Sequence, residues 1–118
     1  MTKDLDIVRL MDIYGCMLTD KQRDYLMFYY EEDLSLAEIA ANEGITRQGV
    51  RDAIKRAEVQ LAEFEDKLGL LTKQEERERA LGEILGSART IVKMGYVGEI
   101  SDQSARIERI AQGLLMSA

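Results

Sequence analysis

The sequence contains no proline, no histidine and no tryptophan. Because proline breaks helix interiors and marks loops, its absence favours a run of helices joined by glycine turns. Histidine is the commonest general base and metal ligand, and the sequence has no nucleophile–base pair, no phosphate-binding loop and no cluster with metal-ligand spacing. We therefore expect a protein that is not an enzyme and that has no cofactor and no metal site.

Cysteine is nearly absent as well, and long hydrophobic runs are missing. Cys16 is the single cysteine, which excludes an intrachain disulfide, and its apolar neighbours Met17 and Leu18 indicate that it is buried. Charges recur every few positions in residues 1–15, unlike the apolar core of an export signal. No uncharged apolar run is long enough to span a bilayer. These features predict a cytoplasmic protein without membrane insertion.

Acidic residues outnumber basic ones, and the net charge is −6. This balance argues against indiscriminate binding to phosphate backbones. The charge is uneven, because residues 1–71 hold 9 basic and 15 acidic residues whereas residues 72–118 hold 7 of each. Within the acidic half, residues 46–56 contain four basic residues and a single acidic one, Asp52. A small basic patch on an acidic protein indicates focused contact with nucleic acid.

Apolar residues recur in steps of three and four, which predicts an all-α fold. No alternation of apolar and polar residues lasts long enough to indicate a strand. Capping-box patterns begin at Thr19 and Ser35, and Thr46 and Ser101 are expected to cap two further helices. Helices are expected at about residues 4–14, 20–31, 36–43, 47–68, 73–94 and 101–116.

The most informative segment is residues 35–56, SLAEIAANEGITRQGVRDAIKR. It has the order of a helix-turn-helix, with a short helix, a tight turn containing glycine and a second helix. Ala40 is small enough for the two helices to cross, and Gly44 can adopt the positive φ of the turn. A helical hairpin that binds nothing would share many of these features. The residues expected to fill the angle between the helices are Ile39, Ile45, Val50 and Ile54.

Polar residues occupy the outward side of the second helix in this motif. The start of a recognition helix is the end that meets base edges. Duplex DNA is the favoured partner, and structured RNA stays open as an alternative. Contacts to nucleic acid are expected from Arg47, Gln48, Arg51, Asp52 and Lys55, with Arg56 touching a phosphate.

Four aromatic residues lie between positions 25 and 30 and are candidates for stacking on bases. Tyr25, Phe28 and Tyr29 have helical spacing, which indicates that they belong to the hydrophobic core. Tyr30 is then the one expected at the surface of this group.

Residues 18–61, LTDKQRDYLMFYYEEDLSLAEIAANEGITRQGVRDAIKRAEVQL, resemble region 4 of bacterial sigma factors, which carries a helix-turn-helix for promoter DNA. The N-terminal run LMDIYGCMLTDKQRDYLMFYYEEDLSLAEIA is still more similar to the YlxM family of small helix-turn-helix proteins from Gram-positive bacteria. The resemblance covers residues 5–70. It implies a sigma region 4-like head that binds DNA and regulates transcription.

The same resemblance implies a link to the signal recognition particle, because genes of the family lie beside those of the particle's GTPase and its receptor. That neighbourhood implies a regulatory or accessory role in the pathway. A second function stays open: a non-catalytic adaptor that binds a protein or ribonucleoprotein of the pathway, including its RNA. An open basic face on the second helix of the motif would favour nucleic-acid binding, whereas a covered one would favour the adaptor.

We expect a helix-turn-helix head at residues 1–69 and a helical tail at residues 70–118 that mediates oligomerisation. Apolar residues continue to the end of the helix at 47–68. The head is expected to bury only the first three of them, Val50, Ile54 and Ala57. Leu61, Phe64 and Leu68 are expected to project beyond the head, and the helices at 73–94 and 101–116 bring apolar stripes of their own. These three stripes are expected to need a second copy as cover. A homodimer would hold two recognition helices about 34 Å apart, the spacing of successive half-sites. A tail folded back on its own head would give a monomer.

Overall fold

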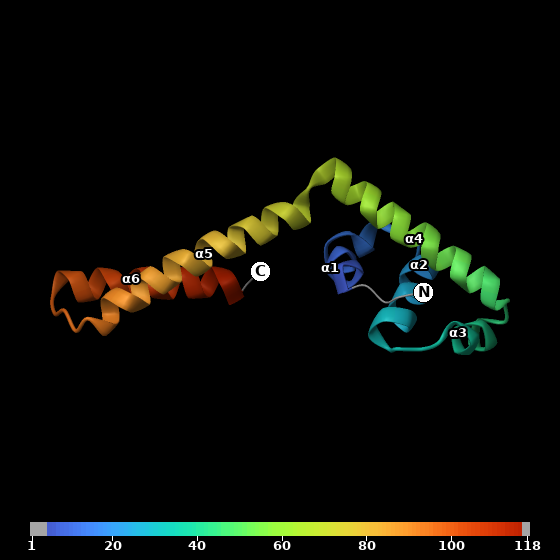
Figure 1. Ribbon diagram of the computed structural model, residues 1–118, viewed down its shortest axis with the longest axis horizontal. Helices are drawn as coiled ribbons and strands as arrows, with labels where there is room; N and C mark the ends of the chain where they lie inside the picture. The colour runs from blue at the N-terminus through green and yellow to red at the C-terminus, as the bar shows by residue number, and fades with distance from the viewer. Residues whose placement is uncertain (1–4, 117–118) are drawn as a thin grey trace. The chain divides into compact units, whose positions relative to one another are not determined.

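The computed structural model describes residues 5–116. Within this range the chain is all-α, as expected, and contains no strand (Figure 1). A short 3₁₀ turn, Gly15–Met17, follows the first helix, and a π-helical turn, Met27–Glu31, continues the second. The α-helices in chain order are α1 (Leu5–Tyr14), α2 (Asp20–Leu26), α3 (Leu36–Glu43), α4 (Arg47–Leu68), α5 (Leu70–Lys93) and α6 (Glu99–Met116).

Local signals set the boundaries of α3 and α4 and the start of α2. The two expected capping boxes are confirmed, because the hydroxyls of Thr19 and Ser35 each accept a hydrogen bond from the backbone amide three residues on. Gly44 and Gly69 end α3 and α4 in the left-handed conformation, with φ of +69° and +63°. Glycine adopts this region without the steric penalty that a Cβ brings.

The last two helices begin earlier than the sequence indicates. α5 starts at Leu70, because its first amides find side-chain acceptors outside the helix. The amide of Leu70 donates to the hydroxyl of Tyr14 over 3.0 Å, and the amide of Leu71 donates to the carboxylate of Glu65 over 2.9 Å. α6 starts at Glu99, so Ser101 lies inside the helix and the expectation that it is a cap was wrong.

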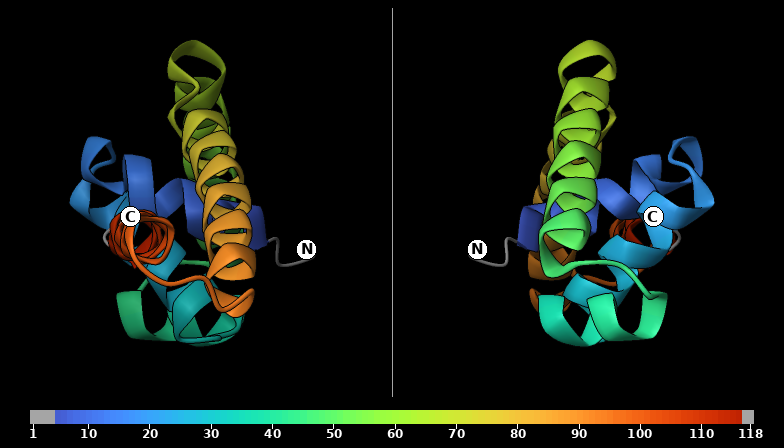
Figure 2. Two further views of the ribbon diagram at one scale, coloured as in Figure 1. Left: turned by 90° about the vertical axis from the view of Figure 1, so that its left-hand side faces the viewer. Right: turned by 90° about the vertical axis from the view of Figure 1, so that its right-hand side faces the viewer.

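The described chain divides into two compact units, residues 1–71 and residues 72–118. In the first unit α4 packs against α1, α2 and α3, which lie alongside it in Figure 2. The core takes side chains from all four helices. Its largest fully buried members are Tyr14, Leu26, Ile39, Ile54, Leu61 and Val50. The second unit is formed by α5 and α6.

The expectation that three apolar residues of α4 project beyond the head was wrong for two of them. Leu61 is fully buried, and Phe64 is half-buried against the core, with its ring centroid 5.9 Å from that of Tyr14. The end of α1 covers this part of α4, and Leu71 joins the same core. Only Leu68 is substantially exposed, at 45%.

Tyr30 and Cys16 also differ from expectation. Tyr30 is partly buried instead of lying at the surface; its ring meets the edge of Tyr29 and its hydroxyl donates to the carboxylate of Glu58. Cys16 is exposed, because the 3₁₀ turn that contains it lies at the surface and Leu18 is the residue that turns inward.

No helix within residues 5–116 is both long enough and apolar enough to cross a membrane.

Candidate nucleic-acid interface

The interface begins with the crossing of α3 and α4 around a three-residue turn, residues 44–46. Ala40 and Val50 are buried at this crossing, and the amide of Ile45 donates to the carbonyl of Ala40 over 3.2 Å. Three of the four residues expected to fill the angle do so. Ile45 does not, since it is 41% exposed; it lies in the turn, where helical spacing no longer predicts the direction of a side chain.

The start of α4 is held by a second local device. The hydroxyl of Thr46 accepts a hydrogen bond from the amide of Gly49 over 2.9 Å. A Cβ at Gly49 would lie 3.1 Å from that hydroxyl oxygen, which is tighter than ordinary packing allows. A Cβ at position 49 would therefore press on the capping hydroxyl of Thr46. This close approach is visible only once the position of the cap is known.

All six residues expected to contact nucleic acid lie on α4 and are exposed. Arg47, Arg51 and Lys55 follow one another at four-residue steps, so they form a line along one side of the helix. At a rise of 1.5 Å per residue this basic line is about 12 Å long. Gln48 and Asp52 form a parallel row beside it, and Arg56 lies next to Lys55 in the sequence.

The positive charges of the basic line are not neutralised within the described chain. No ion pair among residues 5–116 involves Arg47, Arg51, Lys55 or Arg56. The acidic residue of the segment, Asp52, accepts a hydrogen bond from the side-chain amide of Gln48 over 2.9 Å. The local charge therefore stays positive and open to solvent.

Of the open hollows that adjoin the basic residues, two are lined by two cations each. The first has a volume of about 290 Å³ and lies at the start of α4, where it is lined by Leu36, Arg47, Gln48 and Arg51. The second has a volume of about 430 Å³ and lies between α2 and α4, where it is lined by Gln22, Lys55, Arg56, Val59, Gln60 and Glu63. The cationic side chains thus border concave surface that can receive an anionic group.

Hydrogen bonds from other helices fix the orientation of α4. The side-chain amide of Gln22 donates to that of Gln60 over 2.7 Å, and the hydroxyl of Tyr30 reaches Glu58. The ammonium group of Lys21 forms an ion pair with the carboxylate of Glu43 over 3.2 Å, which links α2 to the end of α3. The hydrogen bond within this pair raises the pKa of Lys21 above its ordinary value. Sequence reasoning missed these positioning residues, since their partners are more than 20 positions away.

Comparison of the sequence with known proteins identifies relatives. Residues 1–94 match the family model described as "UPF0122: Putative helix-turn-helix protein, YlxM / p13 like". The chain is 46% identical over 76 residues to a UPF0122 protein of Desulforamulus reducens, covering 64% of this chain and 65% of the relative. It is 51% identical over 75 residues to a UPF0122 protein of Bacillus thuringiensis, covering 64% and 68%. A UPF0122 protein of Shouchella clausii is 46% identical over 84 residues, or 71% and 77% of the two chains.

Proposed function

The chain belongs to the UPF0122 family of YlxM/p13-like helix-turn-helix proteins, and from this membership we propose that it is a DNA-binding regulatory protein with α4 as its recognition helix. The observation that carries the proposal is the basic line on α4. Its three cations are exposed at the start of the second helix of the motif, and no ion pair within the described chain engages them.

The chemistry of the exposed residues suits base recognition in the major groove. Arginine can donate two hydrogen bonds to guanine, glutamine can pair with adenine, and a carboxylate can accept from cytosine. Arg47, Gln48, Arg51 and Lys55 make the main contacts in this proposal, and Arg56 touches a phosphate. Asp52 orients Gln48 through their hydrogen bond. The acidic balance of residues 1–71 opposes contact elsewhere on the unit and so favours this one face.

We also propose that the protein acts as a homodimer through its C-terminal residues. A two-fold axis would present two copies of α4 to successive half-sites about 34 Å apart. A role in the signal recognition particle pathway belongs to the same proposal, and it rests on the family alone.

The alternative is an adaptor that binds a protein or ribonucleoprotein of that pathway, including its RNA. The 15 carboxylates of residues 1–71 are consistent with a protein partner, because they repel the phosphates of a nucleic acid outside the basic line. In the adaptor the basic line would meet an acidic protein surface or a structured RNA.

Electrophoretic mobility shift tests these functions directly. Purified protein is titrated into a mixed-sequence duplex DNA pool and, separately, into a structured RNA, each at two salt concentrations. The proposal expects a DNA shift that weakens with salt at a log–log slope of about −3.6, from roughly 0.9 for each of four neutralised phosphates. Binding to RNA alone would support the adaptor. Absence of any shift at low salt would refute nucleic-acid binding.

A further inference from the structure

The contact between α5 and α6 is made mainly by small side chains. Ala88 on α5 and Ser104 and Ala111 on α6 are almost fully buried, together with the larger Leu85. The hydroxyl of Ser104 donates to the carbonyl of Ile100 over 2.7 Å, so it brings no unpaired polar group into the contact. Apart from Leu85, the side chains buried between α5 and α6 are therefore short. The larger apolar side chains must then lie elsewhere.

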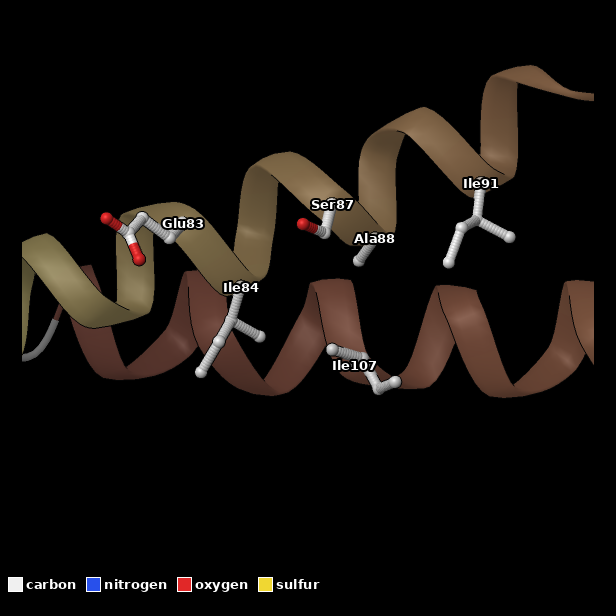
Figure 3. A pocket seen from close by; sticks show the side chains of 6 residues that line it. All are labelled: Glu83, Ile84, Ser87, Ala88, Ile91 and Ile107. Carbon is white, nitrogen blue, oxygen red and sulfur yellow. The ribbon is translucent and has the colours of Figure 1, made fainter.

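Those larger side chains lie beside the contact and are about half exposed. Figure 3 shows Ile84, Ala88 and Ile91 pointing from α5 toward α6, where Ile107 lies close by. The side chains of Glu83, Ile84, Ser87, Ala88, Ile91 and Ile107 line an open hollow of about 360 Å³. Ile84 keeps 48% of its surface exposed, and Ile110, further along α6, keeps 54%.

Four exposed residues and the partly buried Ile91 form two stripes. Ile84 and Ile91 are seven residues apart on α5, and Ile107, Ile110 and Leu114 follow on α6 at steps of three and four, so each set lies along one side of its helix. We call these five residues the isoleucine face. Stripes with this spacing are typical of helices that pack in a bundle, where a further pair of helices supplies the other half of the core.

We propose that a second copy of the α5–α6 hairpin covers the isoleucine face, so that two subunits form a four-helix bundle. This inference rests on the proposed homodimer and assigns its interface. The α5–α6 interface takes the place of one at the end of α4, because Leu61 and Phe64 are already covered within their own unit.

Charge favours a second copy as the occupant. Residues 72–118 carry seven basic and seven acidic residues, so two copies of this unit meet without net repulsion. Residues 1–71 carry the whole net charge of −6, so two copies of this unit repel each other overall. A two-fold interface also requires a surface that is complementary to itself, and a neutral apolar face meets that condition.

The size of the face is sufficient for a specific dimer. The 18 residues of α6 extend about 27 Å, and two adjacent helices are about 20 Å wide, which gives a face of about 540 Å². Two such faces bury about 1,100 Å², above the roughly 1,000 Å² expected of a biological interface. Side-chain relief increases the accessible area further.

Sedimentation equilibrium of the full chain at tens of micromolar tests the interface. The parent is expected at twice its 13.4 kDa mass, and Ile107→Glu at the mass of one chain. Val97→Glu is the matched control, since Val97 is 88% exposed in the loop between α5 and α6 and lies outside the face; it should stay dimeric. A parent that is monomeric or that contains three or more copies would overturn the proposal, and so would an Ile107→Glu variant that stays dimeric.

A second variant separates loss of association from loss of folding. Ile107→Ala retains helix propensity, and circular dichroism should match the parent. Its dimer dissociation constant should rise at least tenfold, because a two-fold interface loses both copies of the side chain. An unchanged constant would contradict the assignment. Electrophoretic mobility shift on the same samples measures nucleic-acid binding independently of association between subunits. A monomeric parent that binds DNA refutes the interface alone, and an isoleucine-dependent dimer that shifts no nucleic acid refutes the proposed function alone.

Discussion

Arg51 occupies the middle of the basic line, four residues from both Arg47 and Lys55, and is exposed. If it donates to a base edge, Arg51→Ala should weaken binding to the preferred DNA by about 1–3 kcal/mol, or about 5- to 150-fold. Fluorescence anisotropy with a selected duplex measures the change. Arg106→Ala removes the same charge from an exposed position on α6 and should have little effect. Equal losses in the two variants would mean that Arg51 acts only through net charge.

Tyr14 is the residue that joins the end of α1 to the start of α5. Its hydroxyl donates to Glu65 over 2.7 Å and accepts from the amide of Leu70. Burial of the side chain, and after it the hydrogen bond to Glu65, raises the pKa of Tyr14 above its ordinary value of 10.0. The folded protein therefore favours the neutral phenol, which donates this hydrogen bond.

Tyr14→Phe removes both hydrogen bonds and leaves the Leu70 amide without its acceptor, so the melting temperature at pH 7 should fall by several degrees. The raised pKa adds a dependence on pH: its stabilisation is complete below about pH 10 and is lost as pH rises through the higher folded value. The parent should lose more stability between pH 9 and 11 than Tyr14→Phe does. The raised pKa of Lys21 affects stability in the same pH range, but Lys21 is present in both the parent and Tyr14→Phe, so its contribution is the same in both. Tyr96→Phe, at an exposed tyrosine, should behave like the parent; equal alkaline losses in all three would contradict the role of Tyr14.

At the scale of elements, the turn between α3 and α4 depends on the left-handed backbone of Gly44. A Cβ at this position would meet no atom within 4 Å, so a substitution is opposed by backbone conformation and not by crowding. Gly44→Ala should destabilise the fold by about 1–2 kcal/mol. Urea denaturation at pH 7 measures this. Gly44→Asn should cost less, because asparagine tolerates the left-handed region; the reverse order of the two variants would show that crowding dominates.

α4 connects two physical roles along its length. Its buried side contributes Val50, Ile54, Ala57 and Leu61 to the core, and its exposed side carries the basic line over the first nine residues. Hydrogen bonds from Gln22 and Tyr30 reach the middle of the helix and leave its start open. The scaffold therefore contacts the middle of α4 without covering its start.

At the scale of the whole molecule, residues 1–71 have a core of their own that includes Leu71. A chain that ends at Leu71 should therefore stay folded, with a cooperative thermal transition and a helical circular dichroism spectrum. Since it lacks the isoleucine face, it should be monomeric and should bind a two-half-site duplex at least tenfold more weakly than the full chain. Sedimentation and anisotropy measure the two effects. A truncated chain that remains dimeric would place the interface in residues 1–71.

The features that depend on neighbouring residues could be predicted from the sequence. A capping box spans four positions, and a left-handed glycine acts on its own turn, so the bounds of α3 and α4 follow from Ser35, Gly44, Thr46 and Gly69. The outward direction of Arg47, Gln48, Arg51 and Lys55 follows in the same way from helical spacing on a helix whose other side is apolar. Their role as contacts stays a prediction, because exposure alone does not identify a ligand.

Features that depend on partners far away in the chain could not be predicted from the sequence, and the tertiary structure was needed to see them. α5 begins at Leu70 because Tyr14, 56 positions earlier, accepts from its first amide. Leu61 is buried because α1 covers the end of α4, and Tyr30 turns inward to reach Glu58. The physical reason is the same in each case: a local pattern shows which side of a helix is apolar, but packing between helices selects which part of that side is covered.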